Sequence, residues 1–159
     1  MAQITLIKFG LNNQKYGIDI LHVRAIEKCE GISSVLGAPD YIEGAVNIRG
    51  EMIPVYSISR KFSLVNKPID DDTRLIIVNL PELPVAVLVD SVDGIVNVTE
   101  SHQADRPKIM QQEATGFVGR VIEVEKKIML LIDIDSLIPE SERKAMLDML
   151  TRGKDDDEE

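Results

Sequence analysis

Short apolar segments that alternate with polar turns run through most of the chain. Apolar residues recur at about every second position in Ile4–Phe9 and again in Tyr16–Ile20, with a polar turn between the two segments. Side chains on a strand point to opposite faces in turn, so this alternation predicts a β-hairpin. Further strands are predicted at 23–30, 45–48, 52–56, 74–80, 83–89, 94–99, 117–124 and 128–134. In the first of these, alternation places Val23, Ala25 and Glu27 on one face and Arg24, Ile26 and Lys28 on the other.

Helical patterns are fewer. A single helical turn is predicted at Gly37–Gly44 and a short helix at Ser57–Leu64. After Pro139, acidic residues in the first turn and apolar residues at helical spacing predict a third helix that ends at Gly153. Ser101–Ala114 has little periodicity and is predicted to be a long exposed loop.

An internal echo indicates two similar β units. Ile18, Ile20, Val23 and Ile26 recur 69 positions later as Val87, Val89, Val92 and Ile95, and Met52, Ile53, Val55 and Ile58 recur 76 positions later as Ile128, Met129, Leu131 and Ile134. We therefore expect one domain over residues 1–153, made of two small β-barrels that correspond roughly to the two halves of the chain, with a polar crossing at Val65–Asp72. Residues 154–159 are expected to form a disordered acidic tail.

Composition and charge exclude several classes of protein. The chain of 159 residues is 44% hydrophobic and 4% aromatic, with a net charge of −9 that falls to −4 without the five acidic residues at its end. A nucleic-acid binder needs a basic face and usually aromatic side chains for stacking, so no nucleic-acid partner is expected. No apolar run approaches the roughly 20 residues that span a bilayer, so direct membrane insertion is not expected. The single cysteine, Cys29, favours a reducing cytoplasmic compartment.

Few residues suggest chemistry. His22 and His102 lie far apart in sequence, and no nucleophile elbow or phosphate-binding glycine loop is present. Two carboxylate pairs, Asp90 with Asp93 and Asp133 with Asp135, are candidates for a divalent cation, the latter predicted to share one face of a strand. A solvated strand end before a helix is the favoured interpretation of that pair, so we predict no catalytic residue, no metal site and no cofactor.

The segment Gly44–Gly50 has a more specific pattern. Arg49-Gly50 separates two apolar strands, and glycine permits a tight reversal of the chain. The guanidinium of Arg49 is thus expected on a rigid hairpin, where it can bond a partner or remain solvated.

This segment, with its Asn-Ile-Arg-Gly sequence, resembles the CheW family of bacterial chemotaxis coupling proteins. The resemblance also rests on Tyr16–Ile20, on Ile53-Pro54-Val55, on Val89–Val92 and on the closing strand at Ile128–Ile134. It implies a mainly β fold of two similar five-stranded barrels on a common apolar seam, with short helices and a C-terminal helix.

The function implied by the resemblance is that of a non-catalytic adaptor. Such a protein couples the cytoplasmic tips of chemoreceptors to the regulatory domain of the histidine kinase CheA, in the cytoplasm at membrane-associated receptor arrays. Arg49 corresponds to the family's receptor-binding arginine and Val23 to an apolar position of the same groove. Asn47, Gly44 and Gly50 correspond to positions that shape the hairpin, and Ile26 is a further candidate anchor for the receptor tip.

The sequence departs from the family pattern at Ala25, where many members carry a glutamate that holds the arginine. Glu27 lies two residues further along and on the same face by alternation, so it is a candidate to replace this glutamate. If it does not, Arg49 is less constrained and receptor preference or affinity differs from that of other members.

For the kinase-binding surface, the candidates are apolar residues near glycine-flanked bends: Ile32, Val35, Tyr41 and Ile42. Three alternatives remain open at this point. One is a scaffold of the same fold in a non-chemotactic kinase pathway, and another is a divalent-metal-dependent β enzyme that uses one of the carboxylate pairs. The third is an interaction domain of a longer kinase, against which Met1, the expected helix end at Gly153 and the acidic run favour a separate chain.

Overall fold

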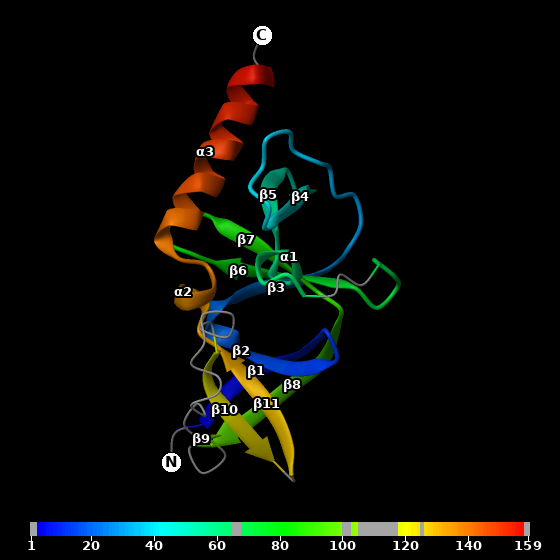
Figure 1. The fold of residues 1–159 in the computed structure, drawn as a ribbon, viewed down its shortest axis with the longest axis vertical. Coiled ribbons are helices and arrows are strands. Elements are labelled where there is room, and N and C mark those ends of the chain that lie inside the picture. The colour runs from blue at the N-terminus through cyan, green and yellow to red at the C-terminus, as the bar shows by residue number, and fades with distance from the viewer. Residues whose placement is uncertain (1–2, 65–67, 100–102, 105–117, 125, 158–159) are drawn as a thin grey trace.

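The computed structural model describes residues 3–64, 68–99, 103–104, 118–124 and 126–157. Within them the chain forms two β-sheets, one above the other in Figure 1, with a helix along the side of the upper one. The strands are β1 (Gln3–Leu11), β2 (Gln14–Asp19), β3 (Val23–Lys28), β4 (Ile42–Ile48), β5 (Glu51–Ser57), β6 (Arg74–Asn79), β7 (Pro84–Val89), β8 (Ser91–Thr99), β9 (Gln103–Ala104), β10 (Val118–Val124) and β11 (Lys127–Ile132). The helices are the 3-10 helix η1 (Ile20–His22), α1 (Ile58–Lys61), α2 (Ile134–Leu137) and α3 (Glu140–Asp157).

The two sheets repeat one topology. The six-stranded sheet has the order β8-β1-β2-β11-β10-β9, and the five-stranded sheet has the order β3-β6-β7-β5-β4. If the two-residue β9 is set aside, each sheet consists of an edge strand followed by two hairpins. The two hairpins of a sheet are joined by a parallel pair of strands, which is β2 with β11 in the larger sheet and β7 with β5 in the smaller one. The mainly β prediction with two similar units is confirmed, although the described pairings close neither sheet into a barrel.

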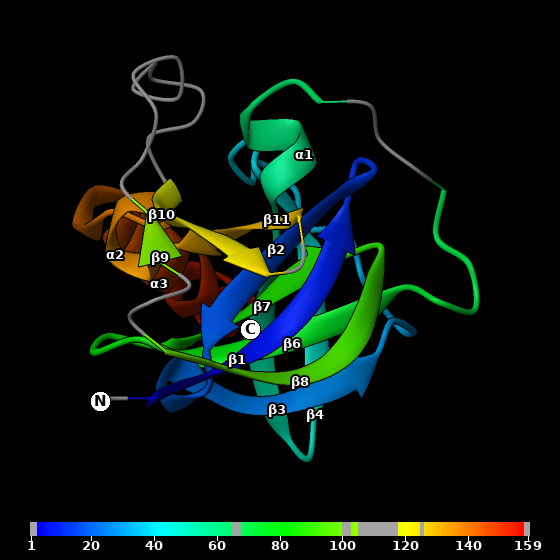
Figure 2. The same ribbon diagram turned by 90° about the horizontal axis from the view of Figure 1, so that it is seen from below.

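The internal echo follows from this repeat, but the units are not the two halves of the chain. The shift of 69 relates β2 and β3 to β7 and β8, and the shift of 76 relates β5 and α1 to β11 and α2. However, β1 and β2 join strands of the second half, while β6 and β7 join strands of the first half. In sequence, the polar segment at 65–72 thus stands between α1, which follows β5, and β6, and both of these strands belong to the five-stranded sheet. Figure 2 shows the two sheets from below.

Three apolar clusters stabilise this arrangement. A shared core takes side chains from both sheets and from α3, including Phe9, Tyr16, Tyr56, Ile76 and Met146. The five-stranded sheet also has its own cluster on the opposite face (Val46, Ile53, Val55, Leu75, Ile77 and Ala86), and the six-stranded sheet has a smaller one (Leu6, Val98, Ile122 and Met129). Burial of apolar surface on both faces of each sheet is the main stabilising contribution to a fold of this kind.

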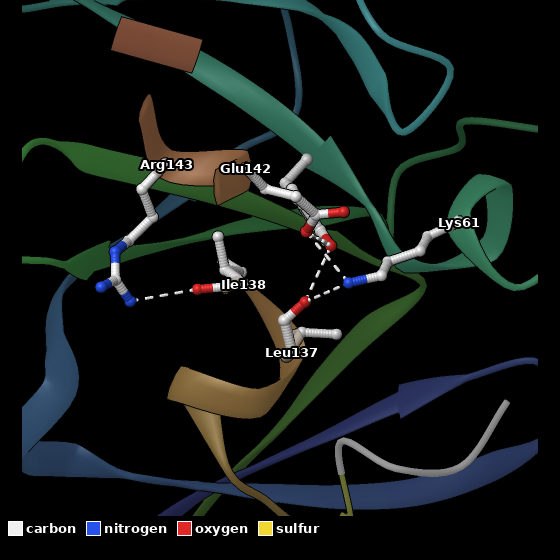
Figure 3. Close-up of polar contacts among 6 residues, drawn as sticks. Lys61, Leu137, Ile138, Glu142 and Arg143 are labelled. Atoms are coloured by element: carbon white, nitrogen blue, oxygen red, sulfur yellow. Dashed lines mark hydrogen bonds and ion pairs between the residues drawn. The ribbon is translucent and has the colours of Figure 1, made fainter. Parts of the chain in front are cut away.

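A polar network fixes α2 and α3 to the five-stranded sheet (Figure 3). Lys61 Nζ donates to the Leu137 carbonyl at 2.6 Å and to Glu142 Oε1 at 2.9 Å. The Tyr56 hydroxyl lies 2.9 Å and 2.8 Å from the same two acceptors. Burial, together with the hydrogen bond to Glu142, raises the pKa of Tyr56 above its ordinary value of 10.0, so Tyr56 is a neutral hydrogen-bond donor in this network.

Several local predictions are wrong. Gly37–Gly44 forms no helical turn, because Ile42 N donates to the Pro39 carbonyl at 2.9 Å in a β-turn and β4 begins at Ile42. Gly153 does not end α3, which continues through it to Asp157, so residues 154–157 of the predicted acidic tail are helical. The last two residues of that tail, 158–159, lie outside the described residues. The predicted loop at 101–114 contains β9, and its remaining residues lie outside the described ranges. No helix in the described part of the chain has the length and apolar character needed to cross a membrane.

Candidate functional site

The hairpin between β4 and β5 presents Arg49 at its tip. The two-residue loop Arg49-Gly50 has positive φ angles of 52° and 86°, as a type I′ turn requires, and Ile48 pairs with Glu51 on either side of it. Asn47 Oδ1 accepts a hydrogen bond from Gly50 N at 3.0 Å, which stabilises the turn. The side chain of Arg49 is 78% exposed, so the hairpin fixes its backbone while leaving its guanidinium accessible.

Glu27, the candidate to replace the usual glutamate, forms an ion pair with Arg49. Arg49 Nη1 lies 3.2 Å from Glu27 Oε1, and the Glu27 side chain is only 27% exposed. A second ion pair of opposite polarity, Arg24 Nη1 with Glu51 Oε2 at 3.0 Å, joins the same two elements, and Arg24 also donates to Asn79 Oδ1 at 2.8 Å. Two ion pairs therefore connect edge strand β3 to the tip of the β4–β5 hairpin.

A bulge in β3 changes the predicted faces. The register against β6 shifts between Val23 and Ala25, so Val23 pairs with Val78 and Ile26 pairs with Ile76. Opposed residues of an antiparallel pair share a face, and both partners belong to the shared core. Val23 thus lies on the face of Ile26, whereas Ala25 and Glu27 share the face that leads to Arg49. The predicted receptor-binding residues consequently divide between the two sides of β3.

The apolar candidates differ in exposure. Val23 is half-buried against the shared core, whereas Ile26 is 40% exposed at the edge of the sheet. Two further exposed apolar residues were not predicted: Leu21 in η1, which is 86% exposed, and Ile95 in β8, which is 63% exposed. The echo offered a signal for Ile95, because it equates that residue with Ile26.

Gly44 has a structural role inside β4. A Cβ added there would collide with the Ser33 carbonyl oxygen, and the approach allows Ser33 and Ala45 to exchange backbone hydrogen bonds of 2.9 Å and 2.8 Å. Gly44 thus permits the loop before β4 to lie against the strand, and it does not take part in the Arg49 turn itself.

The predicted kinase-binding residues are only partly accessible. Ile42 is 2% exposed in the shared core, so it is structural, and Tyr41 packs on Tyr56 with ring centroids 5.3 Å apart. Ile32 and Val35 are partly exposed on the loop before β4. Leu36 on the same loop is fully exposed and was missed, because a leucine that follows Val35 in a loop has no pattern that separates a surface residue from a core residue.

Protein donors engage the carboxylate pairs considered for a cation. Asp133 and Asp135 do not share a strand face: β11 ends at Ile132, and the Asp133 carboxylate accepts from Asp135 N at 3.2 Å and from Ser136 Oγ at 3.0 Å as the N-cap of α2. This is why the predicted strand to Ile134 ends early.

In the other pair, Asp90 accepts from Asn12 N at 3.0 Å, and Asp93 lies 2.6 Å from Lys15 Nζ. The hydrogen bond from Lys15 lowers the pKa of Asp93 below its ordinary value of 3.8. Among the described residues, no group of three His, Cys, Asp or Glu side chains is placed to hold a metal ion.

Known proteins that are similar to this chain belong to the CheW family, which its sequence motifs resemble. The family model for the CheW-like domain matches residues 5–142. The chemotaxis protein CheW of Klebsiella aerogenes is 28% identical over 144 residues, which cover 91% of this chain and 86% of that protein. The chemotaxis protein CheW of Bacillus subtilis is also 28% identical over 144 residues, covering 90% and 92%.

A solved structure agrees as well. The crystal structure of the scaffolding protein TtCheW from Thermoanaerobacter tengcongensis superimposes with a TM-score of 0.78 and 25% sequence identity, over 89% of this chain and 92% of that one. The double-sheet fold, the Arg49 hairpin and the extent of the family match lead to one assignment: the chain belongs to the CheW family, whose CheW-like domain spans most of its length.

Proposed function

We propose that this protein is a non-catalytic adaptor of bacterial chemotaxis, which couples the cytoplasmic tips of chemoreceptors to the histidine kinase CheA. The observation that carries the proposal is Arg49, held by Glu27 on a type I′ hairpin at the position of the family's receptor-binding arginine. The names of the relatives, chemotaxis protein CheW and a scaffolding protein, support the same function.

The receptor tip, a helical hairpin, would dock across the edge of the five-stranded sheet. β3 is an edge strand there, so a partner reaches both of its faces: Ile26 on one, and Glu27 with Arg49 on the other. An arginine with free N–H donors suits the carboxylate and amide oxygens of a helix surface. Truncation of a central interface arginine typically costs about 2 kcal/mol or more of binding free energy, which is roughly thirtyfold in affinity.

The kinase would bind a different surface, so that both partners are held at once. The loop before β4 is our candidate, with Ile32 and Val35 from the sequence prediction and Leu36 from the structure. Tyr41 contributes at most its exposed edge, since its ring packs on Tyr56. The protein would act in the cytoplasm and be recruited to membrane-associated receptor arrays by the receptor tips.

The test is a pair of calorimetric titrations of the purified protein, one with a receptor fragment that contains the tip and one with the regulatory domain of CheA. We expect wild type to bind both, and Arg49→Ala to lose at least tenfold in affinity for the tip while retaining the kinase. Arg60→Ala is the matched control, because Arg60, in α1, forms a comparable ion pair at 3.2 Å with Glu43 of the same sheet. It should leave tip binding unchanged.

The other outcomes separate the alternatives. Binding to the kinase domain without binding to the receptor tip would favour a scaffold of another kinase pathway, which Ala25 in place of the usual glutamate keeps open. Binding to neither partner would refute the adaptor proposal.

A further inference from the structure

A small pocket lies between β3 and the tip of the β4–β5 hairpin. Its volume is about 230 Å³, which is enough for several water molecules at roughly 30 Å³ each, or for one side chain. It is lined by Ala25, Ile48, Ile53 and Ile77 together with the charged residues Arg24, Glu27, Arg49 and Glu51.

The pocket exists because residue 25 is small. Ala25 pairs with Ile77 in the register of β3 against β6, so its methyl group points to the same face as Ile77, toward the sheet's own cluster. Ile48 and Ile53 belong to the same side, the first partly buried and the second fully buried. A longer side chain at position 25 would extend into this space, whereas alanine leaves an apolar surface open beside Arg49.

The charges around the pocket balance one another. Glu27 pairs with Arg49 at 3.2 Å, and Arg24 pairs with Glu51 at 3.0 Å. A free ion of either sign would have to compete with a partner already in place, so the balanced charges favour an uncharged occupant. The four apolar lining residues, Ala25, Ile48, Ile53 and Ile77, favour an aliphatic one. Arg49, which is 78% exposed, offers its remaining N–H donors to an acceptor next to that occupant.

We propose that this pocket receives one aliphatic side chain of the receptor tip, while Arg49 binds a carboxylate or amide oxygen beside it. The inference rests on the proposed adaptor function and specifies its contact. It replaces Val23 and Ile26 as the apolar anchor on the Arg49 side, because those two residues lie on the opposite face of β3. An aliphatic side chain that leaves water for an apolar pocket supplies a large part of the affinity of a small interface.

The pocket can be filled from within by Ala25→Leu, which leaves all four charged residues in place. We expect this variant to bind a receptor-tip fragment at least about tenfold more weakly than wild type in calorimetry, and to bind the CheA regulatory domain with unchanged affinity. Ala25→Val occupies less of the space with a residue well suited to strands. It should show a smaller loss and serves if the leucine variant does not fold.

A second readout observes the pocket directly. In protein labelled with ¹³C at the alanine methyl groups, the Ala25 signal should shift on addition of the tip fragment, whereas that of Ala145 in α3, which does not line the pocket, should not. If wild type binds the tip, yet both variants bind equally well and the Ala25 methyl signal does not move, the pocket inference is wrong and the adaptor function stands. If wild type does not bind the tip at all, the adaptor function itself fails.

Discussion

The network at Tyr56 allows a quantitative prediction for the attachment of α3. Replacing Tyr56 by Phe removes a hydroxyl that lies within 2.9 Å of the Leu137 carbonyl and 2.8 Å of the Glu142 carboxylate, and changes little else, because the ring is completely buried. A hydrogen bond to a charged acceptor contributes about 1.5–3 kcal/mol to stability. Lys61 still donates to both acceptors at 2.6 Å and 2.9 Å, so neither is left unpaired, and we expect the lower end of this range.

We therefore expect Tyr56→Phe to lower the free energy of unfolding by about 1.5 kcal/mol, and the melting temperature by roughly 5 °C for a chain of this size. Lys61→Met should cost more, about 2–3 kcal/mol, because it leaves the carboxylate of Glu142 without its cation. The ion pair is not fully buried, with side-chain exposures of 19% and 17%, so the loss should stay below that of a fully buried pair. Urea unfolding followed by circular dichroism measures each value.

The double variant gives the decisive test. Tyr56 and Lys61 share two acceptors, so each protects the other's partner from being left without a donor. The combined loss should exceed the sum of the single losses by more than about 0.5 kcal/mol. Additive losses, or a Tyr56→Phe change below about 0.5 kcal/mol, would refute the shared network as the reason why α3 is fixed to the sheet.

Three further predictions concern other sites. Glu27→Ala should weaken binding of the receptor tip, measured by calorimetry, while changing the free energy of unfolding by less than about 1 kcal/mol, as is usual for exposed ion pairs; unchanged binding would remove Glu27 from the site. Gly44→Ala should destabilise the fold by at least about 2 kcal/mol in urea unfolding, because the new Cβ meets backbone, whereas Gly119→Ala, with no atom nearer than 3.5 Å, should change little. The lowered pKa of Asp93, caused by Lys15, means that the unfolded state binds the proton more readily, so this stabilisation is present above about pH 4 and is lost as pH falls further. Asp93→Asn should flatten that acid decline, and an unchanged slope would contradict the assignment.

Most of the strands could be predicted because their pattern is local. Alternation of apolar and polar residues reports on a half-buried strand without knowledge of its partners, and nearly every predicted strand is present within a few residues. The exchange of strands between the two sheets could not be predicted in this way, since it depends on pairing between residues far apart in sequence. The bulge at Val23 and Ala25 is a further example: one extra residue against β6 reverses the face of everything before it, and no local signal marks it.

In the candidate site too, features set by local sequence could be predicted, and features set by packing could not. The Arg49 turn follows from turn chemistry, since a two-residue loop that ends in glycine satisfies the positive φ angles of a type I′ turn, and the Asn47 side chain supports it. Ile42 shows the opposite case. Its side chain is apolar and lies near a bend, which describes a core residue as well as a binding residue, and only the packed structure identifies it as core.

The presence of alanine at position 25 and of the carboxylate at position 27 has two consequences. Both residues lie on one face of β3, two positions apart, so a carboxylate at position 27 instead of 25 is displaced by roughly 7 Å along the strand and still reaches Arg49, at 3.2 Å. The place beside Arg49 that a glutamate at position 25 would occupy is left as the small pocket in which Ala25, Ile48, Ile53 and Ile77 are accessible. The arginine is therefore paired from a different point, and position 25 beside it presents a methyl group in place of a carboxylate. Glu27→Ala tests the first consequence and Ala25→Leu the second, so the two effects on receptor binding can be measured independently.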